Sequence, residues 1–151
     1  MVDTRTKGLR GEYAVRDLLR LWTGLEWERT PSSGALEHTK GDIYIPQEKQ
    51  QFVIEVKNYK DTAIDHTILT ALTNKLTIWW TKLTHQASTA KCKPILFFKH
   101  DRSKWFVAVD IKPKAIKKYL YMSPHGCYTM LAEEWLDKEW DNYVKESKAR
   151  T

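Results

Sequence analysis

Three charged residues that could act together on a phosphate ester lie within one short stretch of the chain. Asp42 is followed, after twelve intervening residues, by Glu55, and Lys57 comes two residues later in the apolar run 51–57, QFVIEVK. Two carboxylates brought together form a hard oxygen site suited to Mg²⁺ or Mn²⁺, and such an ion can polarise a phosphodiester and activate a water molecule. A nearby lysine can orient the nucleophile or stabilise charge developing on the phosphate. The pattern therefore indicates metal-assisted hydrolysis.

An isolated E-x-K motif is weak evidence, because short motifs recur by chance. Its plainer interpretation is a solvated strand face on which Glu55 and Lys57 form a pair of little energetic value. Three features favour chemistry instead. The motif lies in an apolar run, where a buried charge is expensive; Gly41-Asp42 lies one predicted strand upstream; and a predicted helix that carries Glu12 precedes both.

The hydrophobic pattern predicts elements that would position these residues. In the strand 51–57, Phe52, Ile54 and Val56 point to one face, and Val53, Glu55 and Lys57 point to the other. Gly24 is the expected end of the first helix, and residues 31–41 form a loop. The predicted elements are a helix over 5–22, strands over 25–30, 42–46 and 51–57, a long helix over 64–90, a hairpin-like strand pair over 94–99 and 104–110, a basic connector over 112–118 and a terminal helix over 132–148.

This order of elements predicts an α/β fold, with a mixed sheet and helices on its faces. A length of 151 residues fits a single domain over 1–151. No apolar run approaches the length of a membrane span, and the N-terminal residues lack the apolar core of a signal peptide. Cys92 and Cys127 have no metal-ligand spacing. We therefore expect a cytoplasmic protein, in the host cytoplasm if the chain is virus-encoded, with two reduced thiols.

The charge distribution favours a polyanionic partner. The net charge is +6, and residues 61–125 carry eleven Lys and Arg against four Asp and Glu. Such a surface gains affinity for nucleic acid when phosphates release their counterions. An anionic membrane would fit the charge as well, but no basic amphipathic anchor accompanies it.

The order of these motifs resembles the PD-(D/E)XK nuclease superfamily, with Gly41 in the place of its loosely kept proline. More specifically, it resembles the archaeal-type Holliday-junction resolvases, some of whose relatives are virus-encoded. These open with a K-G-x-x-x-E helix, here Lys7, Gly8 and Glu12, and continue through an arginine and a serine-containing loop, here 29–34. The resemblance covers about residues 5–110, with a looser similarity to about 136. It implies a restriction-endonuclease-like core with a central mixed sheet flanked by helices.

The resemblance also implies roles for individual residues. Asp42, Glu55 and the main-chain carbonyl of Val56 would bind the metal, Lys57 would be the catalytic lysine, and Glu12 would join the metal shell through water. Read without the resemblance, Glu12 is equally well a solvated helix residue. The DNA backbone would be contacted by Lys7, Arg10, Arg29, Ser32 and Ser33, although the serines also fit a simple turn.

One departure from the family is Tyr13, because close relatives often carry a basic residue directly after the helix glutamate. This puts one phosphate contact in doubt, which Arg10 or Arg16 could replace.

Other candidates are weaker. His38, His66, His85, His100 and His125 are scattered, and no pair has helical metal spacing. Gln86 could face the site from the long helix. Lys112, Lys114, Lys117 and Lys118 fit phosphate contacts or a solvated connector. Trp79 and Trp80 could stack on bases, but core or dimer-interface positions are favoured. Adjacent helical positions diverge by about 100°, so at least one of the two is expected to reach beyond the core.

Together these features predict a Mg²⁺- or Mn²⁺-dependent DNA endonuclease that cleaves branched DNA, with a four-way junction as the first candidate. Resolving a junction needs two symmetric cuts, so a homodimer is the natural assembly. Three alternatives remain open. They are a less selective nuclease acting on flaps, forks or duplex DNA, a non-catalytic DNA-binding module, and a purely structural role for the polar strand face.

Overall fold

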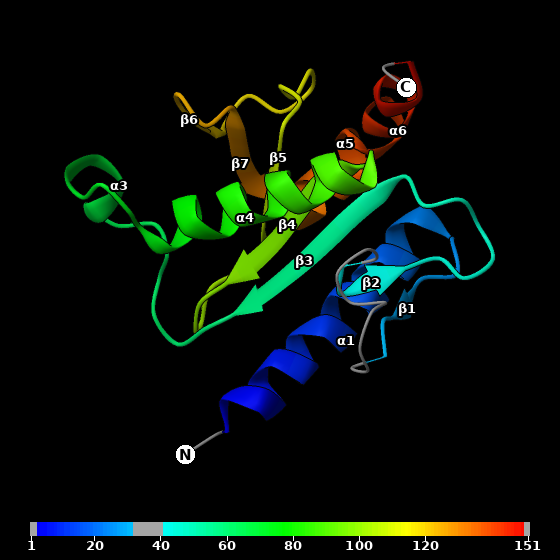
Figure 1. Ribbon diagram of the computed structural model, residues 1–151, viewed down its shortest axis with the longest axis horizontal. Coiled ribbons are helices and arrows are strands. Elements are labelled where there is room, and N and C mark those ends of the chain that lie inside the picture. Colours follow the sequence, from blue (N-terminus) through cyan, green and yellow to red (C-terminus); the bar gives the residue numbers. More distant parts are fainter. Residues whose placement is uncertain (1–2, 32–40, 150–151) are drawn as a thin grey trace.

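A seven-stranded mixed sheet with helices on both faces forms the molecule, as described by a computed structural model over residues 3–31 and 41–149 (Figure 1). The strand order is β1-β2-β3-β4-β5-β7-β6. The strands are β1 (Glu28–Arg29), β2 (Ile43–Tyr44), β3 (Phe52–Asn58), β4 (Lys93–Lys99), β5 (Phe106–Val109), β6 (Leu120–Met122) and β7 (Cys127–Leu131). The helices are α1 (Thr4–Thr23), α3 (Thr67–Thr70), α4 (Lys75–Ala90), α5 (Ala132–Lys138) and α6 (Trp140–Ala149). The predicted α/β class is confirmed.

The parallel pair β3 and β4 forms the centre of the sheet, with Glu55 opposite Leu96. All other pairings are antiparallel. A parallel pair needs a crossover connection, and here α4 belongs to that connection (Figure 1). Both central strands are consequently covered on both faces, which explains why QFVIEVK and PILFFK are largely apolar.

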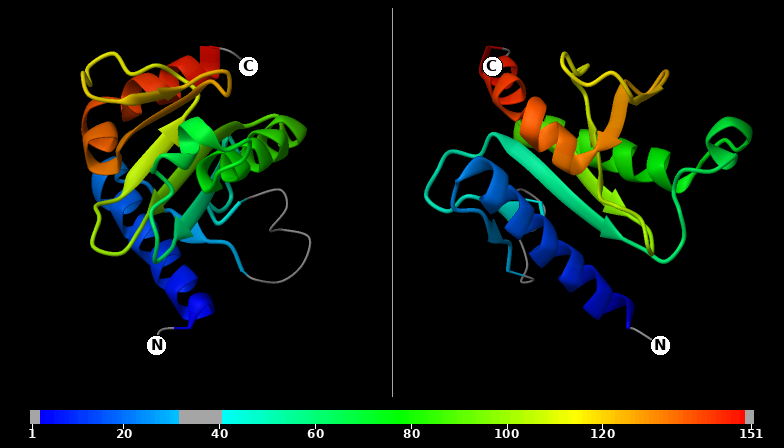
Figure 2. Two further views of the ribbon diagram at one scale, coloured as in Figure 1. Left: turned by 90° about the vertical axis from the view of Figure 1, so that its left-hand side faces the viewer. Right: turned by 180° about the vertical axis from the view of Figure 1, so that it is seen from behind.

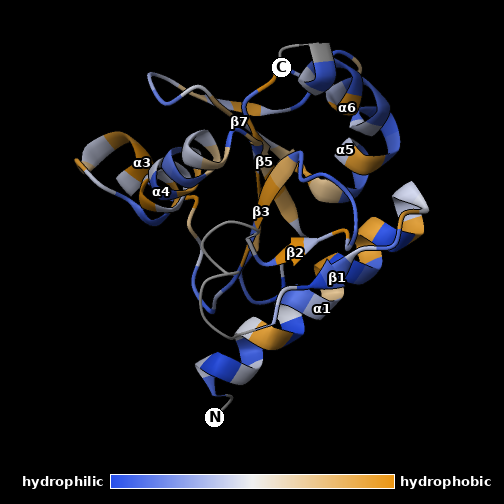
Figure 3. Ribbon diagram, turned by 45° about the vertical axis from the view of Figure 1, so that its right-hand side comes forward, coloured by the Kyte–Doolittle hydropathy of each residue, from blue (hydrophilic) through white to orange (hydrophobic). Residues whose placement is uncertain are grey.

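The two faces of the sheet have separate cores, and Figure 2 shows the helices that cover the sheet. On one face, Ile54 and Val56 of β3 pack with residues of α1, α5 and α6. On the other face, Val53 packs with Leu76, Trp80 and other residues of α4. The predicted alternation along β3 is therefore confirmed. Colouring by hydropathy shows hydrophobic residues along the central strands and mixed hydrophobic and hydrophilic residues on the outer helices (Figure 3).

The first helix agrees with the sequence pattern at both ends. The Asp3 side chain accepts a hydrogen bond from the Arg5 N–H, which caps α1, and Gly24 ends it in the left-handed region with φ of 72°. None of the helices within 3–31 and 41–149 is long and apolar enough to cross a membrane.

The predicted helix over 64–90 was wrong in its first part, which contains the short α3 and a break before α4. Asn74 causes the break. Its side chain accepts from the Thr77 N–H while the Thr77 hydroxyl bonds back to the Asn74 N–H, a capping box that starts a new helix. The Asn74 amide also donates to the Ala63 carbonyl at 2.8 Å. These bonds stabilise a helix start in the middle of an apparently helical pattern.

Two further predictions need correction near the C-terminal end. The antiparallel pair β6 and β7, with Leu120 opposite Thr129, was not predicted. The helix expected over 132–148 is divided at Glu139 into α5 and α6.

Both tryptophans of the Trp79–Trp80 pair pack within the chain, against the expectation that one reaches outward. Trp80 is buried, and its indole N–H donates to the His125 carbonyl at 3.0 Å. Trp79 is half-buried and lies 5.2 Å from the Tyr59 ring and 6.1 Å from the Phe98 ring, between centroids. The twist of the sheet and the long Tyr59 side chain provide the second contact surface that the helix geometry required.

Candidate active site

The site is built around β3, whose side chains Glu55 and Lys57 project on the α4 face of the sheet. They share this face with Val53, which packs in the α4 core. Glu55 is half-buried, as is Lys57. Because β3 pairs with β4 at both positions and with β2 at Ile54, the positions of these side chains are set by the sheet rather than by a loop.

Gly41 allows Asp42 to approach β3 closely. Its φ is +72°, and a Cβ at this position would lie 2.6 Å from the Ile54 carbonyl oxygen and 2.9 Å from the Ile54 nitrogen. A proline, whose φ is near −65°, could not adopt this conformation. The Asp42 N–H donates to the Ile54 carbonyl at 2.7 Å, and the Asp42 carbonyl accepts from the Thr30 N–H at 2.8 Å. Glycine thus replaces the family's proline here for a steric reason.

The Asp42 carboxylate is held against the strand by the main chain of Val56. Its Oδ2 accepts a hydrogen bond from the Val56 N–H at 2.8 Å. In a strand, the N–H and C=O of one residue point toward the same side. The Val56 carbonyl therefore points toward the side on which Asp42 lies. The structure brings together all four groups named for the metal and catalytic lysine: Asp42, Glu55, Val56 and Lys57.

The two carboxylates repel each other's charge. Burial and the adjacent Asp42 carboxylate together raise the pKa of Glu55 to about 8, although the Lys57 and Lys82 ammonium groups act in the opposite direction. The Glu55 and Asp42 carboxyls also lie within hydrogen-bonding contact. Without a cation, the pair therefore retains a proton at neutral pH, since two ionised carboxylates in contact are costly.

A divalent cation could take the place of this proton, because its charge would allow both carboxylates to stay ionised and close together. Among the described residues no group of three or more His, Cys, Asp or Glu side chains could hold a metal. A cation at Asp42 and Glu55 would therefore complete its shell with water and the Val56 carbonyl. Mg²⁺ usually binds through one or two carboxylates and keeps several waters, so the donor set fits.

Glu12 comes from α1, which packs on the opposite face of the sheet from α4. Its Oε1 is 3.5 Å from Nη1 of Arg29, and both side chains are half-buried. The Arg29 guanidinium also lies 5.6 Å from the centroid of the Tyr13 ring, and the Arg16 guanidinium lies 4.8 Å from it. Tyr13, which departs from the family pattern, thus positions two arginines near Glu12 by cation–π contacts.

The residues expected to contact DNA are distributed unevenly. Lys7 lies near Lys57, because both line one pocket with Asn58 and Tyr59, and the Lys7 ammonium forms an ion pair with Asp101. Arg10 is exposed on α1. Ser32 and Ser33, together with His38, lie outside the described residues.

Several residues near the site were not identified from the sequence. The charge of Lys82 on α4 acts to lower the pKa of Glu55. Tyr59, Lys60 and Lys75 line the pocket that also contains Lys57. Tyr59 and Lys60 follow Lys57 by two and three residues, so their closeness in sequence is a signal that could have identified them. Lys75 and Lys82 could not be found in this way, because only the crossover of α4 brings them to β3.

Comparison with known proteins assigns the chain to a family. Residues 3–145 match the family described as "Phage putative PDDEXK endonuclease". Protein D14 of Escherichia phage T5 is 44% identical over 115 residues, which cover 72% of each protein. Among solved structures, Archaeoglobus fulgidus Hjc, a Holliday junction resolvase from an archaeal hyperthermophile, matches 83% of this chain and 88% of its own at 18% identity, with a TM-score of 0.45.

Proposed function

The chain belongs to the phage PD-(D/E)XK endonuclease family, and we propose that it hydrolyses DNA phosphodiesters at Asp42 and Glu55 with a divalent cation. The observation that carries the proposal is the contact between these two carboxylates beside Lys57. A solvated strand face would not require Gly41 at a backbone position closed to other residues, nor would it force a shared proton on Glu55. Enzymes of this superfamily generally use divalent metals.

The chain's own groups divide the work in this proposal. When bound, Mg²⁺ or Mn²⁺ would polarise the scissile phosphodiester and lower the pKa of a coordinated water. The Val56 N–H keeps the Asp42 carboxylate in one orientation. Glu55 would hold the cation as an ionised carboxylate and release its proton to solvent on binding, because a cation favours the ionised form. The Lys57 ammonium, on the same strand face, stabilises negative charge on the phosphate oxygens.

Glu12 and Arg29 act together in the proposal. Arg29 neutralises Glu12 and holds it at 3.5 Å, which leaves Glu12 able to accept a hydrogen bond from a water of the metal shell. Arg29, Arg10 and Lys7, with Ser32 and Ser33, would contact the phosphate backbone.

The preferred substrate in the proposal is branched DNA, with a four-way junction first. The order of Lys7, Gly8, Glu12, Arg29, Asp42 and the E-x-K strand supports this choice. Two opposed cuts require two active sites, and we propose a homodimer that supplies them. The proposed dimer no longer rests on Trp79 or Trp80, since both pack inside the chain. Light scattering at micromolar concentration, alone and with junction DNA, tests it.

A cleavage assay tests the function. A synthetic four-way junction, a flap and a linear duplex of the same sequence are incubated with the protein in Mg²⁺, in Mn²⁺ or in EDTA. We expect incision of the junction with either metal, slower incision of the duplex, and none in EDTA. Equal rates on all three substrates would favour the less selective nuclease, and binding without cleavage under every condition would favour the non-catalytic module.

A further inference from the structure

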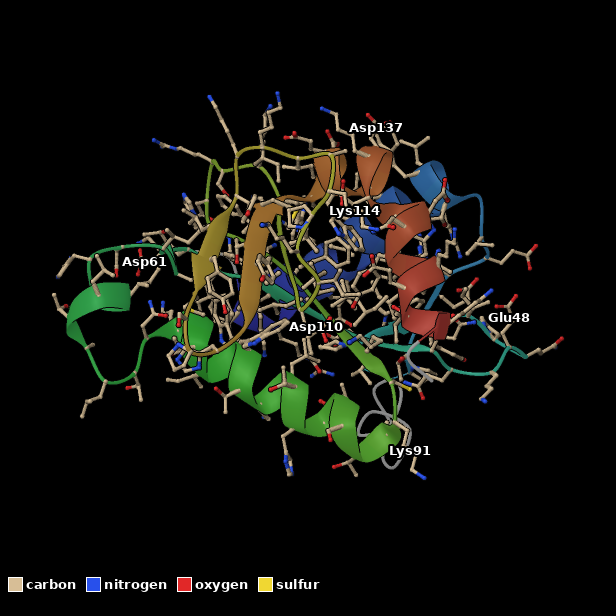
Figure 4. The ribbon with its side chains drawn as sticks, turned by 90° about the horizontal axis from the view of Figure 1, so that it is seen from above. Glu48, Asp61, Lys91, Asp110, Lys114 and Asp137 are labelled. Atoms are coloured by element: carbon tan, nitrogen blue, oxygen red, sulfur yellow. The ribbon has the colours of Figure 1, made fainter. Side chains whose placement is uncertain are left out.

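A pocket of about 560 Å³ opens beside the catalytic lysine, and its walls come from four parts of the chain. Thr4, Lys7 and Gly8 belong to the first turns of α1, Val56–Asp61 to the end of β3, Asp101 to the turn between β4 and β5, and Lys75 to the start of α4. The volume lies in the range of small-ligand pockets, about 300–1,000 Å³. In Figure 4 the labelled Asp61 lies at the α3 end of α4, and Lys91 lies at the other end.

The charges on the pocket favour a phosphate. Four lysines and two aspartates line it, and Lys7 is paired with Asp101. Lys57, Lys60 and Lys75 then remain against Asp61, which leaves a positive excess. Lys60 and Lys75 are exposed. The Lys75 ammonium lies 5.6 Å from the centroid of the Tyr59 ring, so a base that stacks on this ring would displace it toward the phosphate. A lysine cluster alone would fit any solvated surface, so the case depends on the shape and the aromatic surface of the pocket.

Tyr59 gives the pocket a fixed aromatic wall. Its side chain is 39% exposed, although its ring is stacked on Trp79 at 5.2 Å with an interplanar angle of 21°. The Tyr59 N–H donates to the Lys99 carbonyl at 3.1 Å, which fixes the backbone. Trp79 is in turn held against Phe98 of β4. An exposed ring supported in this way can stack on a base without losing much conformational freedom.

Gly8 leaves the opposite wall open. A Cβ at Gly8 would have no neighbour within 4 Å, so packing gives no reason for glycine there, and glycine inside a helix costs about 1 kcal/mol relative to alanine. Gly11, one turn later, differs because its Cβ would meet Asn58 at 2.8 Å. A helix residue that weakens α1, serves no internal contact and lines the pocket leaves space for a ligand to approach the backbone.

We propose that this pocket binds one unpaired nucleotide of the DNA strand, with its base stacked on Tyr59 and its phosphate among Lys57, Lys60 and Lys75. A paired base within a duplex is covered on both faces by its neighbours and cannot present a face to Tyr59. The pocket therefore selects DNA in which a base is already unstacked, as at a branch point, a flap or a gap. This inference rests on the proposed nuclease function, since it places the nucleotide next to the scissile phosphate.

Photocrosslinking tests the placement without requiring cleavage. A four-way junction with 5-iodouracil at the branch point is irradiated with the wild-type protein in EDTA, and crosslinked peptides are identified by mass spectrometry. We expect the main crosslink at Tyr59, and none at Tyr59 when the same base lies within a fully paired duplex. Tyr121 is the matched control, because it is 52% exposed and packs on Tyr128 at 4.6 Å on the far edge strand β6. Equal crosslinking of both tyrosines overturns the proposal.

Substitutions test the role of the base contact in Mg²⁺. Tyr59→Leu keeps an apolar contact with Trp79 but has no ring face, so kcat/KM on the junction should fall about 5- to 100-fold, as expected for loss of one base–aromatic stack. Tyr59→Phe should stay within about twofold of wild type. Gly8→Leu should raise the melting temperature, because leucine favours the helix, and yet remove the Tyr59 crosslink.

The outcomes separate this inference from the proposed function. A wild type that cleaves junctions, with unchanged rates in folded Tyr59→Leu and Gly8→Leu variants, leaves the nuclease intact and rejects the nucleotide pocket. A wild type that cleaves no DNA but crosslinks at Tyr59 rejects the nuclease proposal and retains the binding pocket.

Discussion

Glu55 and Glu139 are two glutamates withdrawn from water, and the protein satisfies their charges in different ways. Glu139 is 3% exposed, and its two carboxylate oxygens accept hydrogen bonds from the Lys114 and Ala115 N–H groups, both at 2.7 Å. Among the described residues, no backbone N–H donates to Glu55, which instead contacts another carboxylate. The lysines near Glu55 do not compensate for this, because its pKa stays raised to about 8.

We call Glu139 the structural carboxylate and Glu55, which has the proposed role in metal binding, the chemical carboxylate. Fixed N–H donors satisfy the charge of Glu139 within the fold, and that carboxylate holds the start of the basic connector against the junction of α5 and α6. Glu55 is left with an unfavourable charge that only a proton or a cation can relieve. The number of N–H groups that donate to a glutamate carboxylate away from water therefore helps to distinguish a structural role from a functional one.

The largest expected effect is loss of cleavage at the chemical carboxylate. Glu55→Gln and Asp42→Asn should each reduce single-turnover cleavage by about a thousandfold or more, because metal binding supplies several kcal/mol of transition-state stabilisation. Binding of junction DNA in EDTA should remain near that of wild type, since phosphate contacts supply most of the affinity. Glu48→Gln is the control, and Figure 4 shows the labelled Glu48 on the outside of the molecule. Near-normal turnover in Glu55→Gln would mean that Glu55, like Glu139, has no role in cleavage.

A smaller loss is expected where the backbone brings the two carboxylates together. Gly41→Ala places a Cβ 2.6 Å from the Ile54 carbonyl oxygen at a φ of +72°, so Asp42 must move away from β3. We expect cleavage to fall at least tenfold and stability to fall by about 2–4 kcal/mol. The matched control is Gly126→Ala, because Gly126 has φ of +66° with open space around it. If both variants lose activity equally, close approach at Gly41 is not what organises the site.

At the structural carboxylate, stability should respond and catalysis should not. Glu139→Ala leaves the Lys114 and Ala115 N–H groups without their acceptors, and we expect a loss of about 2–4 kcal/mol in the free energy of unfolding by urea. Catalysis per folded molecule should be unchanged. Glu133→Ala, at an exposed residue of α5, should change stability by less than about 0.5 kcal/mol. Equal effects of the two substitutions would show that the hydrogen bonds of Glu139 contribute little.

Glu55→Gln should act on stability in the opposite direction. The pKa of Glu55 is raised from 4.5 to about 8 in the folded protein, so between these values the folded state binds more protons than the unfolded state. The wild type therefore loses stability as pH rises through this window. Glutamine does not ionise, and in EDTA at pH 8 we expect the variant to be more stable by about 1–3 kcal/mol.

Urea unfolding of both proteins at pH 5 and pH 8 measures this difference. The gain should be small at pH 5 and should shrink or reverse when Mg²⁺ is added, because only the wild type can use the cation. A variant that is less stable than wild type at both pH values would show that Glu55 is satisfied within the fold, as Glu139 is.

The same comparison shows what the sequence could reveal. The alternation in QFVIEVK is local, and it correctly assigned Glu55 and Lys57 to one face of β3. The capping box of Asn74 and Thr77 was also readable, although the long hydrophobic period concealed it. The division of the terminal helix at Glu139 was not, because the N–H groups that bind this residue lie 24 and 25 positions away in sequence.

The environment of the site was harder to predict than its motif. The ion pair of Lys7 with Asp101 joins residues 94 positions apart, and the stack of Tyr59 on Trp79 depends on the crossover of α4. The steric need for Gly41 depends on how close the chain comes to Ile54. Residue types and short spacings predicted the candidate metal-binding carboxylates and the candidate catalytic lysine, whereas the pocket around them arises from contacts that no local pattern contains.

The smallest expected effect concerns the connector that Glu139 holds in place. Lys112, Lys114, Lys117 and Lys118 are exposed on it, while Ile111 and Ile116 are buried, so the lysines project from an anchored loop. Figure 4 shows Lys114 beside α6, where its ammonium lies 2.9 Å from Glu146.

If the basic middle of the chain contacts phosphates, log affinity for junction DNA should fall linearly and steeply with log salt concentration. Changing both Lys117 and Lys118 to Gln should lower the magnitude of this slope by about 2 and weaken binding about three- to tenfold, whereas Lys145→Gln on α6 should change neither. Titrations by fluorescence anisotropy between low and high salt measure both quantities. An unchanged slope of log affinity against log salt in the double variant would mean that the connector is solvated and does not contact DNA. The role of Glu139 would then be purely structural. A reduced slope would mean instead that the structural carboxylate positions a second DNA contact, on the far side of the sheet from β1.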